Sequence, residues 1–255
     1  MTGVNLRDRA VDAVEIMDDA DCDPVMLART YADFRVVNAV VSGWHGIYRR
    51  RIRPALSTTR LTTLLDVGCG GGDLSRALVR WAAADGLRLE VTAIDPDARA
   101  HAWAASRPAV RGLSFRAALS SELVAEGARF DFVVSNHVLH HLDADQLRGL
   151  LADSEALVGA GPNEEGAGTA LHADIARSRL AYLGFGAATW PFFRSSFIRA
   201  DGLTSIRRSF TPAELRRDLP VGWQVLPEHP SRYVLRWPAA PIEPAAPIGH
   251  GGADA

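Results

Sequence analysis

The sequence predicts an α/β fold in which a mostly parallel sheet of buried strands carries helices on both faces. The first observation is a set of short apolar segments that indicate strands, at residues 61–67, 89–95, 113–116, 130–137 and 169–175. The second is the helical spacing of apolar residues in several of the intervals between them. The third is a glycine-rich turn after the first strand, where open α/β sheets bind ligands.

Composition limits the class of protein. The chain has 255 residues with 47% hydrophobic content, enough for one domain with an appendage, and its net charge of −2 does not favour a nucleic-acid partner. Cys22 and Cys69 lie far apart, so we expect neither a disulfide framework nor a metal cluster. The chain shows no signal peptide and no apolar run near the roughly 20 residues that cross a bilayer. We therefore expect a cytoplasmic protein without a transmembrane segment.

The central stretch is Leu-Leu-Asp-Val-Gly-Cys-Gly-Gly-Gly-Asp-Leu-Ser, residues 64–75. It indicates a strand, a glycine turn and the start of a helix, because Leu74 and Leu78 recur at helical spacing. A dinucleotide fingerprint would place its third glycine where Asp73 stands. Asp66 adds a second carboxylate, which would repel a dinucleotide but suit a ligand with an ammonium and a sulfonium. A nicotinamide-dependent oxidoreductase is thus the weaker interpretation.

This turn resembles the first motif of the class I S-adenosylmethionine-dependent methyltransferases, an acidic residue followed by x-G-x-G-x-G. The resemblance covers residues 61–177 and implies a Rossmann-like, seven-stranded, mostly parallel sheet with an antiparallel last strand. It implies that S-adenosylmethionine is the cofactor and S-adenosylhomocysteine the product, with the glycine loop beneath the methionine part and Asp66 near its amino group. The predicted cofactor-binding residues are Asp66, Gly68, Cys69, Gly70, Asp95, Pro96 and Asn136.

Asp95 ends the second strand, before Pro96. A carboxylate there can accept hydrogen bonds from both ribose hydroxyls of an adenosine cofactor. The alternative is that Asp95 caps the helix predicted to follow, a role that Asp97 can also fill. Many relatives carry an Asp after the third strand, near the adenine, where this chain has Ala117 and Ala118.

The fourth strand ends in Asn136, followed by His137, His140 and His141. His137 and His141 have the spacing of one helix face, but no Glu lies between them and no third ligand is evident nearby, so we expect no metal. His140 or His141 is the predicted catalytic base, because an imidazole can take the proton of a phenol or enol as it attacks the methyl group. The alternative is that both pack and cap before the helix that Asp143 begins.

Residues 1–56 precede the first strand and are predicted to form a helical lid over the methyltransferase domain, residues 57–237. The spacing indicates a short helix near residues 11–17 and a longer one that begins at Pro24. An aromatic and arginine-rich insertion at about 184–210 is expected on the substrate side, and residues 238–255 are expected to be disordered. The predicted substrate-binding residues are Tyr31, Arg35, Trp44, Tyr48, Asp174 and Arg177, although the aromatic ones also suit core packing.

Residues 30–35, 42–44 and 200–209 look similar to bacterial methyltransferases of phenolic-lipid and polyketide metabolism. This narrower resemblance implies O-methylation of a small, apolar, aromatic acceptor in secondary metabolism, by in-line displacement at the sulfonium methyl. A carbon or nitrogen acceptor would use the same fold, and a non-catalytic cofactor-binding module is a further alternative. A homodimer is possible.

Overall fold

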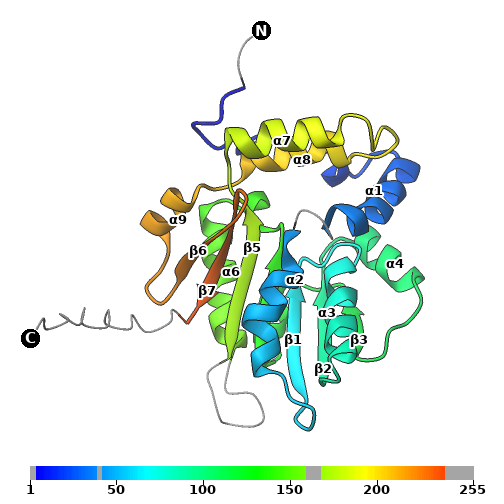
Figure 1. The fold of residues 1–255 in the computed structure, drawn as a ribbon, viewed down its shortest axis with the longest axis vertical. Helices are drawn as coiled ribbons and strands as arrows, with labels where there is room; N and C mark the ends of the chain where they lie inside the picture. Colours follow the sequence, from blue (N-terminus) through cyan, green and yellow to red (C-terminus); the bar gives the residue numbers. More distant parts are fainter. Residues whose placement is uncertain (1–3, 39–41, 159–167, 239–255) are drawn as a thin grey trace, which may run out of the picture.

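A computed structural model describes residues 4–38, 42–158 and 168–238 of the chain. In this part, seven strands form one sheet in the order β3-β2-β1-β4-β5-β7-β6 (Figure 1). β7 is antiparallel to both of its neighbours, and the other pairs are parallel, which confirms the predicted sheet. The strands are β1 Thr62–Val67, β2 Leu89–Ile94, β3 Leu113–Arg116, β4 Phe132–Asn136, β5 Thr169–Ile175, β6 Gln224–Glu228 and β7 Arg232–Trp237.

Helices cover both faces of the sheet, and a further group crosses the carboxyl ends of its parallel strands (Figure 1). One face packs against α2 Trp44–Ile47, the π-helix η3 Tyr48–Ile52 and α3 Asp73–Ala84. The other face packs against α5 Ser120–Ala125, α6 Ala144–Leu157 and α9 Pro212–Asp218. The remaining elements are η1 Ile16–Asp18, α1 Pro24–Val37, η4 Arg53–Ala55, α4 Ala98–Ser106, η5 Leu139–His141, α7 Arg179–Thr189 and α8 Ile198–Arg208.

The central strands explain why the sequence shows continuous apolar runs. Adjacent residues of β1 point to opposite faces: Leu64 packs with the α3 side and Leu65 with the α6 side, and both are 0% exposed. A parallel strand that is covered on both faces needs apolar residues at every position rather than at alternate ones. The sheet therefore forms the centre of the hydrophobic core. The carboxyl ends of its parallel strands are where such a fold can bind a ligand.

The N-terminal prediction needs one correction. The helix expected near residues 11–17 is only the short 3-10 turn η1, and Val11, Val14 and Ile16 are exposed. Of the apolar residues there, Met17 packs against the cluster of Leu27, Tyr31 and Phe197, and the segment is otherwise held by polar bonds to α8. The longer helix α1 begins at Pro24 as predicted, and the Asp23 side chain caps it.

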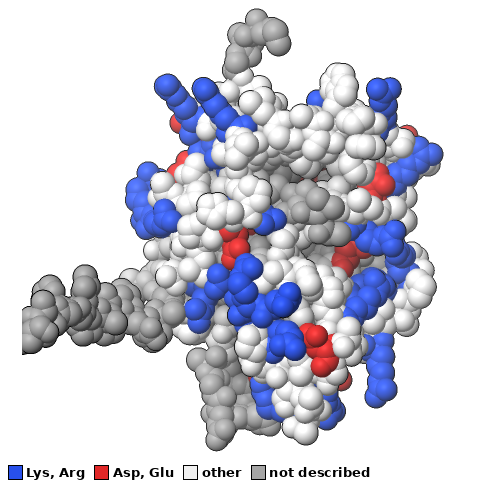
Figure 2. Space-filling model, in the orientation of Figure 1, with Lys and Arg blue, Asp and Glu red and all other residues white. Residues whose placement is uncertain are grey.

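Arginine side chains gather on the face of the molecule over α2, with acidic groups among them (Figure 2). Arg50 and Arg51 of η3 pair with Glu228 of β6, and Arg53 pairs with Asp85 after α3. This basic run is therefore a solvated, largely ion-paired face. No helix in the described part of the chain is long and apolar enough to cross a membrane. The tail predicted to be disordered lies, from residue 239 on, outside the described residues.

Candidate active site

A cavity of about 390 Å³ lies at the carboxyl ends of β1, β2 and β4. Its floor is the glycine loop between β1 and α3, and residues of η1, α1, α7 and α8 complete its walls. Segments from the whole length of the domain thus meet at the sheet edge where open α/β sheets bind ligands.

The glycine loop presents bare backbone to the cavity. Gly68 and Gly70 have φ angles of +68° and +50°, a region that favours glycine. A Cβ on Gly68 would come 2.6 Å from Val138 Cγ2, so the loop packs tightly against the segment after β4. A Cβ on Gly70 would meet no atom within 4 Å, because this residue faces open space. A ligand can therefore approach the main chain at Gly70.

Two carboxylates flank this loop. Asp66 is 1% exposed, accepts a hydrogen bond of 2.5 Å from Ser75 Oγ, and has a pKa that burial raises to about 7. Asp95 accepts hydrogen bonds from the backbone N–H groups of Gly70 (2.8 Å) and Asp97 (2.9 Å), and burial raises its pKa as well. Asp97 is the N-cap of α4, so Asp95 is not needed as that helix cap.

The structure brings all seven predicted cofactor-binding residues together. Each of them lines the cavity: Asp66, Gly68, Cys69, Gly70, Asp95, Pro96 and Asn136. Burial raises the pKa of the Cys69 thiol, so this group is a neutral lining residue rather than a nucleophile. Trp44 Nε1 donates a 2.8 Å hydrogen bond to Asn136 Oδ1 and so fixes the amide at the end of β4.

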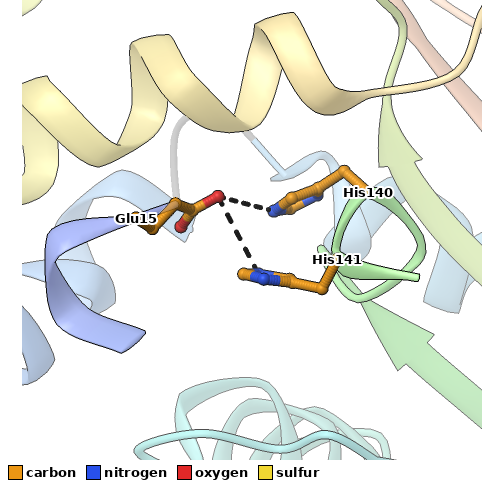
Figure 3. A group of neighbouring side chains, drawn as sticks. All are labelled: Glu15, His140 and His141. Carbon is orange, nitrogen blue, oxygen red and sulfur yellow. Dashed lines mark ion pairs between the residues drawn. The ribbon is translucent and has the colours of Figure 1, made fainter. Parts of the chain in front are cut away.

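Both histidines predicted as catalytic bases line the cavity and face Glu15, a residue the sequence analysis missed (Figure 3). His140 Nε2 lies 3.3 Å and His141 Nε2 4.0 Å from Glu15 Oε1. We call these three residues the His–Glu cluster. Nothing in the local sequence around Glu15 signals this role, because the contact joins the N-terminal segment to η5.

His140 is held between two carboxylates. Its Nδ1 lies 3.0 Å from Asp174, and the imidazole is 2% exposed. Burial opposes the positive charge, but Asp174 and Glu15 outweigh it and raise the pKa of His140 to about 10. Burial likewise opposes the charge of Asp174, yet His140 and His137 hold the pKa of Asp174 well below its usual range.

The position of Glu15 is set by α8. Asp201 accepts hydrogen bonds from the backbone N–H groups of Ile16 (2.7 Å) and Met17 (3.0 Å). Ser205, one turn further along α8, donates a 2.8 Å hydrogen bond to Glu15 Oε1. The turn η1 is thus fixed to α8, and its acidic side chain is fixed toward the two histidines.

The predicted substrate-binding residues divide into two groups. Tyr31 lines the cavity, with its ring stacked on Trp103 at 5.8 Å between centroids. The other five do not line the cavity: Arg35, Trp44, Tyr48, Asp174 and Arg177. Arg35 is exposed, whereas Tyr48 is buried and its hydroxyl donates to Asp85. The Arg177 guanidinium is buried and donates to the backbone carbonyls of Leu6, Arg7 and Ser209.

The apolar walls include Phe34, which lies in the predicted lid, and residues that the sequence analysis did not single out for this site. They belong to η1, α1, α7 and α8: Met17, Phe34, Val37, Phe185 and Ile198. Phe185 and Ile198 fall within the insertion that was expected on the substrate side. The aromatic and arginine content of the sequence identified this region. Only the packing of α7 beside α8 shows which of its side chains face the cavity.

Residues 64–161 match the family model described as a methyltransferase domain. The ubiquinone biosynthesis O-methyltransferase of Caulobacter vibrioides is 42% identical over 83 residues, 31% of each chain. The enzyme of the same name from Methylobacterium sp. (strain 4-46) is 40% identical over 86 residues, 31% of this chain and 30% of that one. The match thus spans about a third of the length of these relatives.

Solved structures share the fold at low identity. Human N-acetylserotonin methyltransferase, in complex with S-adenosylmethionine, gives a TM-score of 0.56 at 12% identity, over 83% of this chain and 55% of that one. The plantazolicin methyltransferase BpumL, in complex with S-adenosylhomocysteine, gives 0.53 at 10% identity, over 84% and 94%. Family match and shared fold agree with the glycine turn: residues 64–161 carry a methyltransferase domain, and the chain has the fold of solved methyltransferases that bind S-adenosylmethionine or S-adenosylhomocysteine.

Proposed function

We propose that this chain transfers a methyl group from S-adenosylmethionine to a hydroxyl of a small aromatic acceptor. The observation that supports this most is one shared cavity, in which the glycine loop and two strand-end carboxylates lie across from the His–Glu cluster. The names of the two relatives, both O-methyltransferases, favour oxygen as the acceptor atom.

The residues at the glycine loop fit the cofactor. When bound, S-adenosylmethionine supplies a methyl group on a sulfonium, which is already a strong electrophile. The bare backbone at Gly70 leaves room for the methionine part, Asp66 offers a carboxylate to its ammonium, and Asp95 offers oxygens to the ribose hydroxyls. The protein then has to align the acceptor oxygen with the methyl group. Such alignment can lower the activation barrier by on the order of 7–11 kcal/mol.

The other half of the cavity suits a neutral, partly apolar acceptor. Its walls include Phe34, Phe185 and Ile198, and no Lys or Arg stands among the described residues that line it. Acidic side chains do line it, so an anionic acceptor would be repelled. Of the two predicted bases, His140 is already protonated, because Asp174 and Glu15 raise its pKa to about 10. We therefore assign to His141, beside Glu15 in the same cluster, the task of taking the proton from the acceptor hydroxyl.

The lid role of residues 1–56 is part of the same proposal. It is supported by Glu15, Met17, Tyr31 and Phe34, all from that segment, which face the cavity. The homodimer and the cytoplasmic location stay predictions.

The first test is calorimetric titration with S-adenosylhomocysteine, with NAD as the control. We expect micromolar binding of S-adenosylhomocysteine alone. Asp95→Ala should weaken it about 10- to 100-fold, the equivalent of hydrogen bonds to a charged group. Asp145→Ala, on the exposed start of α6, should leave it unchanged. Phenolic acceptors should then yield methylated products by mass spectrometry, and the fragmentation pattern should assign the methyl group to oxygen. Absence of cofactor binding, or transfer only to carbon or nitrogen, would overturn the corresponding part of the proposal.

A further inference from the structure

We infer that the His–Glu cluster binds one divalent cation of the zinc type at the acceptor end of the cavity. The sequence offered His137 and His141 at helical spacing but no third ligand nearby. The structure offers a different set, in which the third ligand is Glu15 from the distant N-terminal segment.

The distances between the ligand atoms suit such a cation. One ring nitrogen each of His140 and His141 and one carboxylate oxygen of Glu15 all lie within 4.8 Å of one another. Ligands at about 2.0–2.2 Å from a tetrahedral zinc stand about 3.4 Å apart. His140 Nε2 already stands 3.3 Å from Glu15 Oε1, and His141 Nε2 stands 4.0 Å away. A small rotation of the His141 ring completes the set.

The far side of each imidazole carries the partner that metal-binding histidines need. His140 Nδ1 lies 3.0 Å from Asp174, and His141 Nδ1 lies 3.3 Å from Asp18 Oδ2. A carboxylate on Nδ1 holds a proton there and orients the ring, so that a bound cation takes the place of any proton on Nε2. Glu15 is held in the same way by Ser205 Oγ.

Charge and access favour a bound cation. Glu15, Asp18 and Asp174 place three carboxylates around the two imidazoles. Arg208 lies close by, but its guanidinium donates to the backbone carbonyls of His140 and His141 rather than into the cavity. Glu15, His140 and His141 all line the cavity, so the remaining coordination positions face the space assigned to the acceptor. Three protein ligands with open positions are typical of catalytic rather than structural zinc sites.

The role of this cation rests on the proposed function, whereas its binding does not. The cation would hold the acceptor through its oxygen. The O–H bond would break, the oxygen would stay on the cation, and the proton would pass to water. The cluster would then activate the hydroxyl as a Lewis acid rather than through a free imidazole.

The test is direct metal binding to the full chain. After treatment with a chelator and dialysis, the protein is titrated with Co²⁺, followed by visible absorption, and with Zn²⁺, followed by metal analysis. We expect one equivalent of either cation. His141→Ala and Glu15→Gln should abolish stoichiometric binding, and Asp18→Asn should weaken it about 10- to 100-fold. His45→Ala is the matched control, because this histidine is exposed on α2 and should not affect binding.

S-adenosylhomocysteine binding by the same variants separates the two proposals. We expect it to be retained in His141→Ala and Glu15→Gln, which also shows that these variants are folded. A wild-type protein that binds S-adenosylhomocysteine but no Co²⁺ or Zn²⁺, or whose His141→Ala variant binds metal equally well, would overturn the metal site alone. A protein that binds metal but not S-adenosylhomocysteine would instead contradict the proposed function.

Discussion

At the scale of single residues, the carboxylate that we propose to bind the ammonium of the cofactor has an unusual pKa. Burial raises the pKa of Asp66 to about 7, while its ionised form is the one that can bind an ammonium. We therefore predict that the Kd for S-adenosylhomocysteine is constant above pH 8 and rises as the pH falls, by up to about tenfold per pH unit well below 7. Titrations between pH 5.5 and 8.5 measure this.

Asp66→Asn is the matched variant, since it keeps the shape of the side chain and cannot ionise. Its affinity should be weaker at pH 8 and nearly independent of pH, because no proton has to leave before the ligand binds. A wild-type Kd that does not change across this range would show that Asp66 does not hold the ammonium.

Single residues also show what the sequence can predict. Gly68, Gly70 and Asp66 were predictable because a ligand-binding turn between a strand and a helix is formed by neighbouring residues, so its pattern is visible in the sequence. Asp95 was predictable because a strand end fixes where its side chain lies. Glu15 was not, because it reaches the cavity through tertiary contacts with α8, and no local pattern of residues encodes such contacts.

At the scale of elements, the contact between η1 and α8 completes the acceptor end of the cavity. Asp201 is 3% exposed and accepts both backbone N–H groups that hold η1 in place. Asp201→Ala should release η1, since it removes two hydrogen bonds to a charged group, each worth about 1.5–3 kcal/mol. We predict faster hydrogen exchange at Ile16 and Met17 and a loss of turnover of at least about tenfold, the effect of misplacing a catalytic group.

The affinity for S-adenosylhomocysteine should change little in Asp201→Ala, because the Asp201 side chain bonds to η1, whereas Asp95 bonds to Gly70 and Asp97. Asp145→Ala again serves as the control, since that residue is 87% exposed in its side chain and belongs to α6. Protection of Ile16 and Met17 that equals the wild type would show that η1 does not depend on Asp201.

The elements of the sheet were more predictable than those around the cavity. Strand β5 follows from the continuous apolar run of a strand that is buried on both faces, and helix α6 follows from apolar residues at helical spacing on one side. The short helix expected near residues 11–17 failed because most of its apolar residues are exposed and its structure is set by bonds to α8. The same reasoning explains why Arg35 and Tyr48 were predicted at the site but lie away from it: the side chains of one helix face several environments, and only packing assigns them.

At the scale of the whole molecule, the sheet carries a buried imidazole in addition to that of His140. His172 of β5 is 0% exposed, lies within hydrogen-bond distance of Ser135 Oγ (2.8 Å) and Ser154 Oγ (3.1 Å), and stacks on Trp223. Burial lowers the pKa of His172 to about 3. The folded protein thus holds this group neutral in the centre of the fold, linking β4, β5 and α6.

This imidazole makes the stability of the whole fold depend on pH. The unfolded chain protonates His172 near its ordinary pKa of about 6.5, whereas the folded chain resists protonation down to about 3, so between these values the unfolded state binds more protons. His172 therefore lowers the free energy of unfolding by up to about 1.4 kcal/mol for each pH unit below 6. Urea titrations at pH 7, 6 and 5 measure the slope. His172→Gln, which stays neutral, should be less stable at pH 7 but should flatten the slope, while His45→Gln on the surface should not. An equal slope in wild type and His172→Gln would assign the acid sensitivity to other groups.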